Sequence, residues 1–183
     1  MDFWFINRHP YITTINGKVN YRTITRYSSG DRKEVLKRIQ INRHTRRGFL
    51  VHEYHADNEF KKIESYLVPP TLHTQAAGDH KTTLEQNIRT LKDRTRWMVH
   101  YVPYRKMQLL MIEYIVGQAQ YMLNDFPYKT GILTTMSARK SIEGIPNFDY
   151  NTMSIKLGKS IQLFEGTKNT PHSRSVQAFA INP

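Results

Sequence analysis

The fold is decided by residues 49–96, FLVHEYHADNEFKKIESYLVPPTLHTQAAGDHKTTLEQNIRTLKDRTR. The segment from Phe49 to Ala56 is apolar and aromatic enough for a buried strand, and it ends at Asp57, where a helical segment begins. Residues 82–102 carry apolar side chains at steps of three and four, which predicts a long helix with one buried face. The order of strand, helix, short strand and long helix predicts α/β structure.

One side of the long helix is polar and charged. Glu85, near the helix start, is followed along the same side at steps of four, three and four by Arg89, Lys92 and Arg96. A carboxylate in line with a row of cations suits a metal-dependent enzyme that acts on a polyanion. The alternative for such a run of charges is a solvated helix face. On the same helix, Trp97 is expected to pack near the core.

A third acidic residue, Asp2, belongs to the strand-like run DFWFI over residues 2–6. Adjacent strands of a mixed sheet can bring Asp2 beside Asp57. Only Met1 precedes Asp2, so the N-terminal half of this first strand is expected to be absent.

Three segments of the chain resemble the integrase catalytic domain of copia-type retrotransposons. They are residues 55–60, HADNEF, residues 84–92, LEQNIRTLK, and residues 123–127, LNDFP. The resemblance covers nearly the whole chain. It implies a ribonuclease-H-like fold, in which a mixed sheet of about five strands is flanked by helices on both faces.

The resemblance also implies a catalytic site. The two Asp and one Glu that hold the catalytic metals in that family map to Asp2, Asp57 and Glu85. Carboxylate oxygens suit hard cations such as Mg²⁺ or Mn²⁺. Two such ions, roughly 4 Å apart, can activate the attacking oxygen and stabilise the leaving one in displacement at phosphorus. By resemblance, Asp57 contacts both ions, and Asp2 and Glu85 contact one each.

The implied activity is DNA integration: trimming of the element's DNA ends, followed by attack of the new 3′ hydroxyls on target DNA. The implied partners are the element ends, the target DNA and further copies of the chain, and the implied location is the nucleus. Two alternatives stay open. One is an inactive integrase remnant that only binds nucleic acid, and the other is a ribonuclease-H-type nuclease that cuts the RNA of a hybrid.

Composition agrees with a nucleic-acid partner. The 183 residues include 27 Lys and Arg against 15 Asp and Glu, a formal net charge of +12. An anionic membrane would also suit this charge, but no apolar run approaches the roughly 18 residues of a membrane span. No secretory signal is visible, so an intracellular protein is expected. The absence of Cys excludes disulfides and thiolate zinc sites.

The flanking segments complete the expected organisation. Residues 1–27 predict a three-stranded meander in which Asn16-Gly17 makes a tight turn between strands at 11–15 and 19–24. Residues 31–42 predict a helix. A basic loop follows, whose cations are candidates for DNA contact or for a solvated surface: Arg43, Arg46 and Arg47.

The chain is expected to divide into two parts. Residues 1–130 would form the catalytic core. Residues 131–183, with a short helix near 137–142 and short strands after it, resemble the beginning of the segment that follows the core in the same family.

Overall fold

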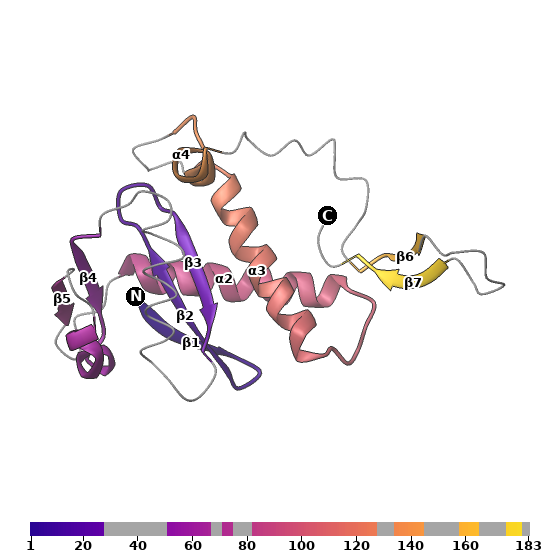
Figure 1. The fold of residues 1–183 in the computed structure, drawn as a ribbon, viewed down its shortest axis with the longest axis horizontal. Coiled ribbons are helices and arrows are strands. Elements are labelled where there is room, and N and C mark those ends of the chain that lie inside the picture. Colours follow the sequence, from indigo (N-terminus) through magenta and orange to yellow (C-terminus); the bar gives the residue numbers. More distant parts are fainter. Residues whose placement is uncertain are drawn as a thin grey trace.

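The computed structural model describes residues 1–27, 51–66, 71–74, 82–127, 134–144, 158–164 and 175–180. These ranges form mixed α/β structure with three small sheets (Figure 1). The helix expected over residues 31–42 and the basic side chains of Arg43, Arg46 and Arg47 lie outside them.

The N-terminal meander is confirmed. Strands β1 (Asp2–Ile6), β2 (His9–Ile15) and β3 (Arg22–Arg26) pair antiparallel in that order. The β1–β2 turn consists of two residues, Asn7 and Arg8, whose φ angles of 48° and 67° are both positive. Such a turn follows the right-handed twist of the strands that it joins.

The expected Asn16-Gly17 turn is wrong in detail, because β3 begins only at Arg22. The Asn16 side-chain oxygen accepts hydrogen bonds from the backbone N–H groups of Lys18 and Val19, at 2.9 and 3.1 Å. The positive φ of this loop, 57°, belongs to Asn20. An Asn side chain that bonds to nearby backbone competes with a two-residue turn, and here it produces a loop of residues 16–21.

A second sheet pairs β4 (Glu53–Ala56) with β5 (Thr71–Thr74) in parallel, across the 3₁₀ helix η3 (Asn58–Tyr66). The backbone nitrogen of Met1 donates to the carbonyl of His55, which places β4 beside the start of β1. The hydrogen-bonded ladders of the described ranges give sheets of three, two and two strands. They therefore do not confirm one continuous sheet of about five strands.

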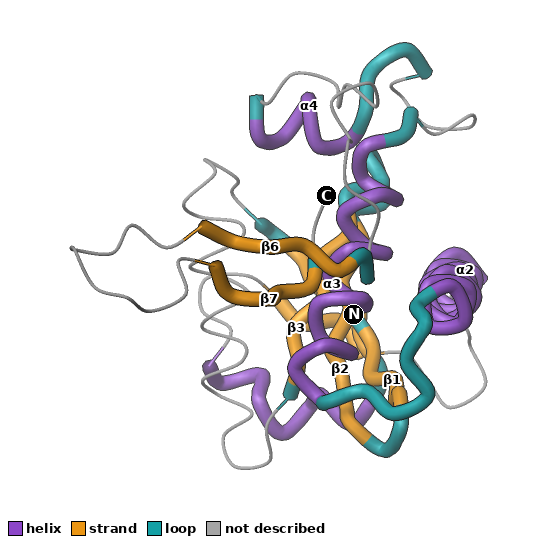
Figure 2. The backbone as a smooth tube through the Cα atoms, turned by 90° about the vertical axis from the view of Figure 1, so that its right-hand side faces the viewer, coloured by secondary structure: helices purple, strands orange, loops and turns teal. Residues whose placement is uncertain are grey.

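Two helices cover one face of the three-stranded sheet. They are α2 (Thr82–Tyr101) and α3 (Leu109–Asp125), close to the bounds that the apolar periodicity predicts. The shared core combines sheet and helix side chains: Trp4, Tyr11, Ile24, Ile88, Leu91, Ile112 and Val116. Figure 2 views α2 end-on and shows β1 on the side of the sheet nearer to this helix.

The opposite face of the sheet is covered by η3. Phe60 is fully buried and stacks on Phe3 of β1, with ring centroids 4.6 Å apart. Successive side chains of a strand point to opposite faces, so Asp2 shares the α2 face with Trp4 while Phe3 points toward η3. The packing of β1 between two layers thus directs Asp2 toward α2.

The outer edge of β3 is closed by α3. Asn124 accepts from the backbone N–H of Arg22 at 2.9 Å and donates to its carbonyl at 2.9 Å. Gln120 donates to the same carbonyl at 2.8 Å. The buried guanidinium of Arg22 in turn donates to Asn87 of α2. This buried polar network fixes both helices against the sheet.

The C-terminal part adds α4 (Ala138–Glu143) and a hairpin of β6 (Ser160–Phe164) and β7 (Ser175–Phe179). The hairpin lies at the far end of the molecule from β4 and β5 (Figure 1). Tyr104, beyond the end of α2, donates to the carbonyl of Gly158 at 3.2 Å and packs edge-on against Phe179. These contacts attach the hairpin to the end of α2.

Candidate active site

An open cavity of about 500 Å³ lies between β1 and α2. We call it the carboxylate cavity, because Asp2 of β1 and Glu85 of α2 both line it. The side chains of the basic row on α2 line it as well: Arg89, Lys92 and Arg96. The helical spacing that puts these four α2 residues on one side therefore faces them toward the strand that carries Asp2.

Asp2 is the most enclosed of the three predicted catalytic residues. It is half-buried, and its carboxylate accepts the backbone N–H of Phe3 at 2.7 Å. Burial raises the pKa of Asp2 above its ordinary value, the Phe3 N–H opposes this rise, and the negative charges of Asp57 and Glu59 add to it. Asp2 and Asp57 are therefore near enough to repel each other.

Asp57 stands at the end of β4 with an exposed side chain. Its carboxylate accepts the N–H of Asn58 at 2.6 Å, and its carbonyl accepts the N–H of Phe60 at 3.0 Å. Asp57 thus stands directly before η3, with its carboxylate bonded to the first N–H of this helix and its carbonyl to the N–H of Phe60. It is not among the residues that line the carboxylate cavity.

Asp2 is thus the residue that connects the predicted triad: it shares the cavity with Glu85 and an electrostatic interaction with Asp57. Within the described ranges, no group of three or more His, Asp or Glu residues is arranged to hold a metal ion. The donor chemistry fits a hard cation, because all three side chains are carboxylates. The joint metal site remains a prediction.

The sequence interpretation did not include two further acidic residues near Asp2, Glu59 and Asp93. Glu59 lies two positions after Asp57, and its charge acts on Asp2. Asp93 lines the carboxylate cavity and pairs with Arg96 at 3.1 Å, with both side chains largely exposed. Asp93 follows Arg89 by four residues, a spacing that makes the two side chains neighbours on the helix surface and would have placed Asp93 beside the basic row.

The chain is similar to solved structures in fold, but its sequence matches no known family. No protein-family model matches the chain, and no curated protein matches it. Among solved structures, a chain in the cryo-EM structure of the simian T-cell lymphotropic virus intasome, in complex with PP2A regulatory subunit B56 gamma, is similar at a TM-score of 0.55 and 10% identity.

The alignment covers 97% of this chain and 64% of the intasome-structure chain, so the present chain spans less than two thirds of that chain's length. At this identity the likeness concerns the fold alone, and it supports an integrase-like fold.

In the part of the chain that the structure describes, no helix is both long enough and apolar enough to span a bilayer.

Proposed function

We propose that the chain is the catalytic domain of a retroelement integrase of the copia type, which trims the DNA ends of its element and joins them to target DNA. The observation that carries this proposal is the carboxylate cavity, where Asp2 and Glu85 share one space with the basic row. The integrase-like fold supports it independently.

Asp2, Asp57 and Glu85 would hold Mg²⁺ or Mn²⁺, two ions in the family that the sequence resembles. When bound, such ions activate an attacking oxygen and stabilise a leaving oxygen at phosphorus. The Phe3 N–H holds the Asp2 carboxylate in one orientation, and the first turn of η3 does the same for Asp57. Carboxylates fixed in this way lose little freedom when they bind a cation.

The basic row would hold the DNA. Arg89, Lys92 and Arg96 follow one another along the same side of α2 from Glu85 onward, and all three line the carboxylate cavity. Their charges would bind successive phosphates and orient the strand along the helix axis, with one end at Asp2 and Glu85. An excess of 12 positive charges over the whole chain adds to the attraction for DNA.

A second candidate is a DNA-binding domain without catalysis. The observation that favours it is the exposure of Asp57 and Glu85, with the Asp57 carboxylate already bonded to the backbone N–H of Asn58. The two candidates differ in whether Asp2, Asp57 and Glu85 bind a divalent cation together.

Calorimetric titration with MnCl₂ and MgCl₂, combined with a strand-transfer assay on a duplex oligonucleotide, tests the proposal. The variants are Asp2→Asn, Asp57→Asn and Glu85→Gln, and the matched control is Glu64→Gln, which removes an exposed carboxylate from η3. We expect the three site variants to lose metal binding by at least about tenfold. They should also lose strand transfer, and the control should keep both.

Three outcomes would change the conclusion. A wild-type chain that binds DNA but neither binds metal nor joins strands is the DNA-binding domain of the second candidate. Metal-dependent cutting of RNA in an RNA–DNA hybrid, without joining, would assign a nuclease instead. A chain that binds neither DNA nor metal would exclude both candidates.

A further inference from the structure

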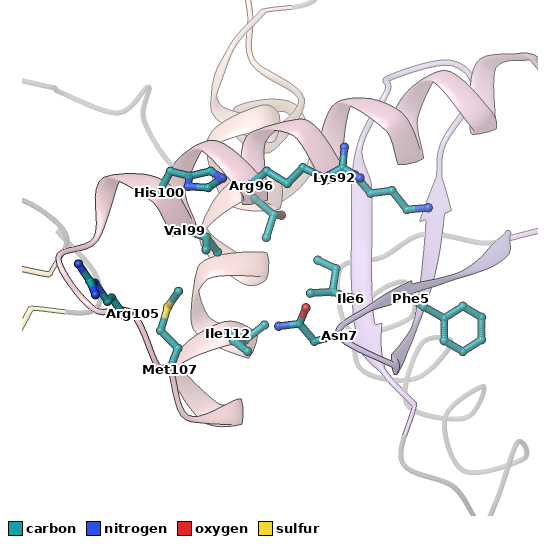
Figure 3. Close-up of a pocket in the computed structure, with 11 residues that line it drawn as sticks. Phe5, Ile6, Asn7, Lys92, Arg96, Val99, His100, Arg105, Met107 and Ile112 are labelled. Atoms are coloured by element: carbon teal, nitrogen blue, oxygen red, sulfur yellow. The ribbon is translucent and has the colours of Figure 1, made fainter.

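A second cavity, of about 390 Å³, lies beside α2 (Figure 3). We call it the turn cavity, because the β1–β2 turn contributes Asn7 to its wall. Lys92 and Arg96 line both cavities, so the two spaces meet at the basic row. Arg105, from the segment that connects α2 to α3, adds a further cation.

The lining of the turn cavity has three chemically different parts. Lys92 and Arg96 of α2 provide the cations along the helix, and Arg105 lies near Met107 (Figure 3). Apolar atoms come from Val99 of α2, from Met107 of the segment that connects the two helices, and from Ile112 of α3. The third part is the amide of Asn7, which Figure 3 shows directed toward Ile112. This amide makes no hydrogen bond with another residue in the described ranges, so its donor and acceptor are available to a ligand.

A single nucleotide has the same three parts. Its phosphate suits Lys92 and Arg96, the faces of its base suit an apolar floor, and the hydrogen-bonding edge of the base suits an amide. The volume is at the lower end of the range for small-molecule pockets, which fits one nucleotide and not a base pair. The base must be unpaired, because the cavity has room for one nucleotide only, and because the Watson–Crick edge of a base is free for Asn7 only when the base has no partner.

We propose that the turn cavity receives one unpaired nucleotide of the DNA strand whose phosphates lie on the basic row. This inference rests on the proposed function, since it takes the bound strand to run along α2. Arg96 lies 11 residues after Glu85, about 16 Å along the helix axis, so the nucleotide would be a few positions from the reacting phosphate. A phosphate at Lys92 or Arg96 would then have the carboxylate cavity on one side and the turn cavity on the other.

Fluorescence anisotropy with the full chain tests the inference on three labelled DNA probes. The first is a blunt duplex, the second carries a short single-stranded extension, and the third carries the same extension with abasic sites in place of its bases. We expect the extension with bases to bind roughly tenfold more tightly than the abasic extension, as for other base-binding surfaces. The blunt duplex should bind like the abasic probe.

Asn7→Gly removes the amide and keeps the turn, because Gly adopts positive φ freely. The matched control is Asn20→Gly, which makes the same change at another positive φ, away from the turn cavity. We expect Asn7→Gly to reduce the preference for bases several-fold without changing affinity for the blunt duplex, and Asn20→Gly to leave both unchanged.

Equal affinity of the wild type for the extensions with and without bases would overturn the inference and leave the proposed function standing. An equal effect of both Gly variants would also overturn it, since Asn7 would then act only through the turn. Failure to bind any of the three probes would overturn the proposed function itself.

Discussion

The position of Asp2 illustrates how a single residue can join two parts of a fold. Its strand places it on the side of α2, where Glu85 lies, and the approach of β4 places the charge of Asp57 near it. Burial is the largest cause of the raised pKa of Asp2; the Phe3 N–H and the positive N-terminus oppose the rise, and Asp57 and Glu59 add to it. The change in the pKa of Asp2 when the Asp57 charge is removed therefore tests whether these two predicted catalytic residues lie close together.

Replacement of Asp57 should lower the pKa of Asp2. Burial is the largest cause of the raised pKa and persists in Asp57→Asn, but the repulsion from Asp57 disappears. A carboxyl-carbon NMR titration of Asp2 measures the change, with Glu64→Gln as the control that leaves it unaltered. An unchanged pKa in Asp57→Asn would mean that the two carboxylates are too distant to share a cation.

Asp125, at the end of α3, gives a second prediction, on stability. Its side chain is buried and accepts from Arg139 of α4 at 3.1 Å. Burial raises the pKa of Asp125 to about 6, and the negative charge of Glu143 adds to the rise. The folded chain therefore binds more protons than the unfolded chain between the ordinary pKa of 3.8 and about 6, so its stability falls as pH rises through this window.

The wild type should lose on the order of 2 kcal/mol of unfolding free energy from about pH 4 to about pH 7, relative to Asp125→Asn. Urea unfolding of both proteins at the two pH values measures this difference. Parallel pH dependence of the two proteins would show that Asp125 titrates normally.

At the scale of single residues, the sequence interpretation succeeded where helical periodicity determines position. Arg89, Lys92 and Arg96 line the cavity with Glu85 as their spacing predicts. It was wrong about Trp97, which is 61% exposed and stacks on Tyr101 with ring centroids 5.5 Å apart. Hydrophobicity indicates that a side chain gains from burial, but only the packing of neighbouring elements decides which side of a helix is covered.

Among the elements, the attachment of the β6–β7 hairpin depends on Gly158. Its φ is +77°, and a Cβ atom there would lie 3.1 Å from Val102 Cγ1 and 3.3 Å from Pro103 Cδ. Gly158 also donates to the carbonyl of Ala180 at 2.7 Å. A side chain at this position would therefore strain both the backbone and the contact with the end of α2.

Gly158→Ala should destabilise the attached hairpin by about 1–3 kcal/mol. Amide hydrogen exchange of Ala180, whose N–H is bonded to Lys159, measures the local opening. Gly144→Ala separates the two causes, because Gly144 has a φ of +66° but open space around it. Equal exchange rates in Gly158→Ala and the wild type would contradict the attachment.

Gly117→Ala, at an exposed position in the interior of α3, should instead stabilise the protein by about 0.5–1 kcal/mol.

The elements themselves were predictable to different degrees. The bounds of α2 and α3 follow from apolar periodicity, a local property of the sequence. The loop of residues 16–21 was not predicted, because a side-chain hydrogen bond of Asn16 outcompetes the tight turn. The meeting of β1 with β4 depends on contacts between residues more than 50 positions apart, and periodicity contains no information on such pairing.

The whole molecule carries a formal net charge of +12, and we expect cations of the basic row to contribute more to DNA affinity than cations elsewhere on α2. Arg96 belongs to the basic row, whereas Arg94, two residues earlier, points about 160° away from it around the helix axis. Both are exposed. Arg96→Ala should reduce the slope of log affinity for duplex DNA against log salt concentration by about 0.9, the value for one lost phosphate contact.

Arg94→Ala is the matched control and should leave the slope unchanged. Filter binding or anisotropy over a series of KCl concentrations measures both slopes. Equal reductions in the two variants would show that DNA is attracted by net charge alone, without an ordered path along α2.

The hydrogen bonds between the Asn124 side chain and the Arg22 backbone should protect the protein from aggregation in concentrated solution. An outer strand with free amides and carbonyls invites pairing with a strand of another copy, the first step toward fibrillar aggregates. The backbone N–H and the carbonyl of Arg22 are both bonded to side chains of α3, so a strand of another copy could not pair with β3 at this residue. Asn124→Ala would free the N–H of Arg22, and Asn124→Ala combined with Gln120→Ala would also free its carbonyl. Light scattering at high concentration should increase in the single variant and increase further in the double variant.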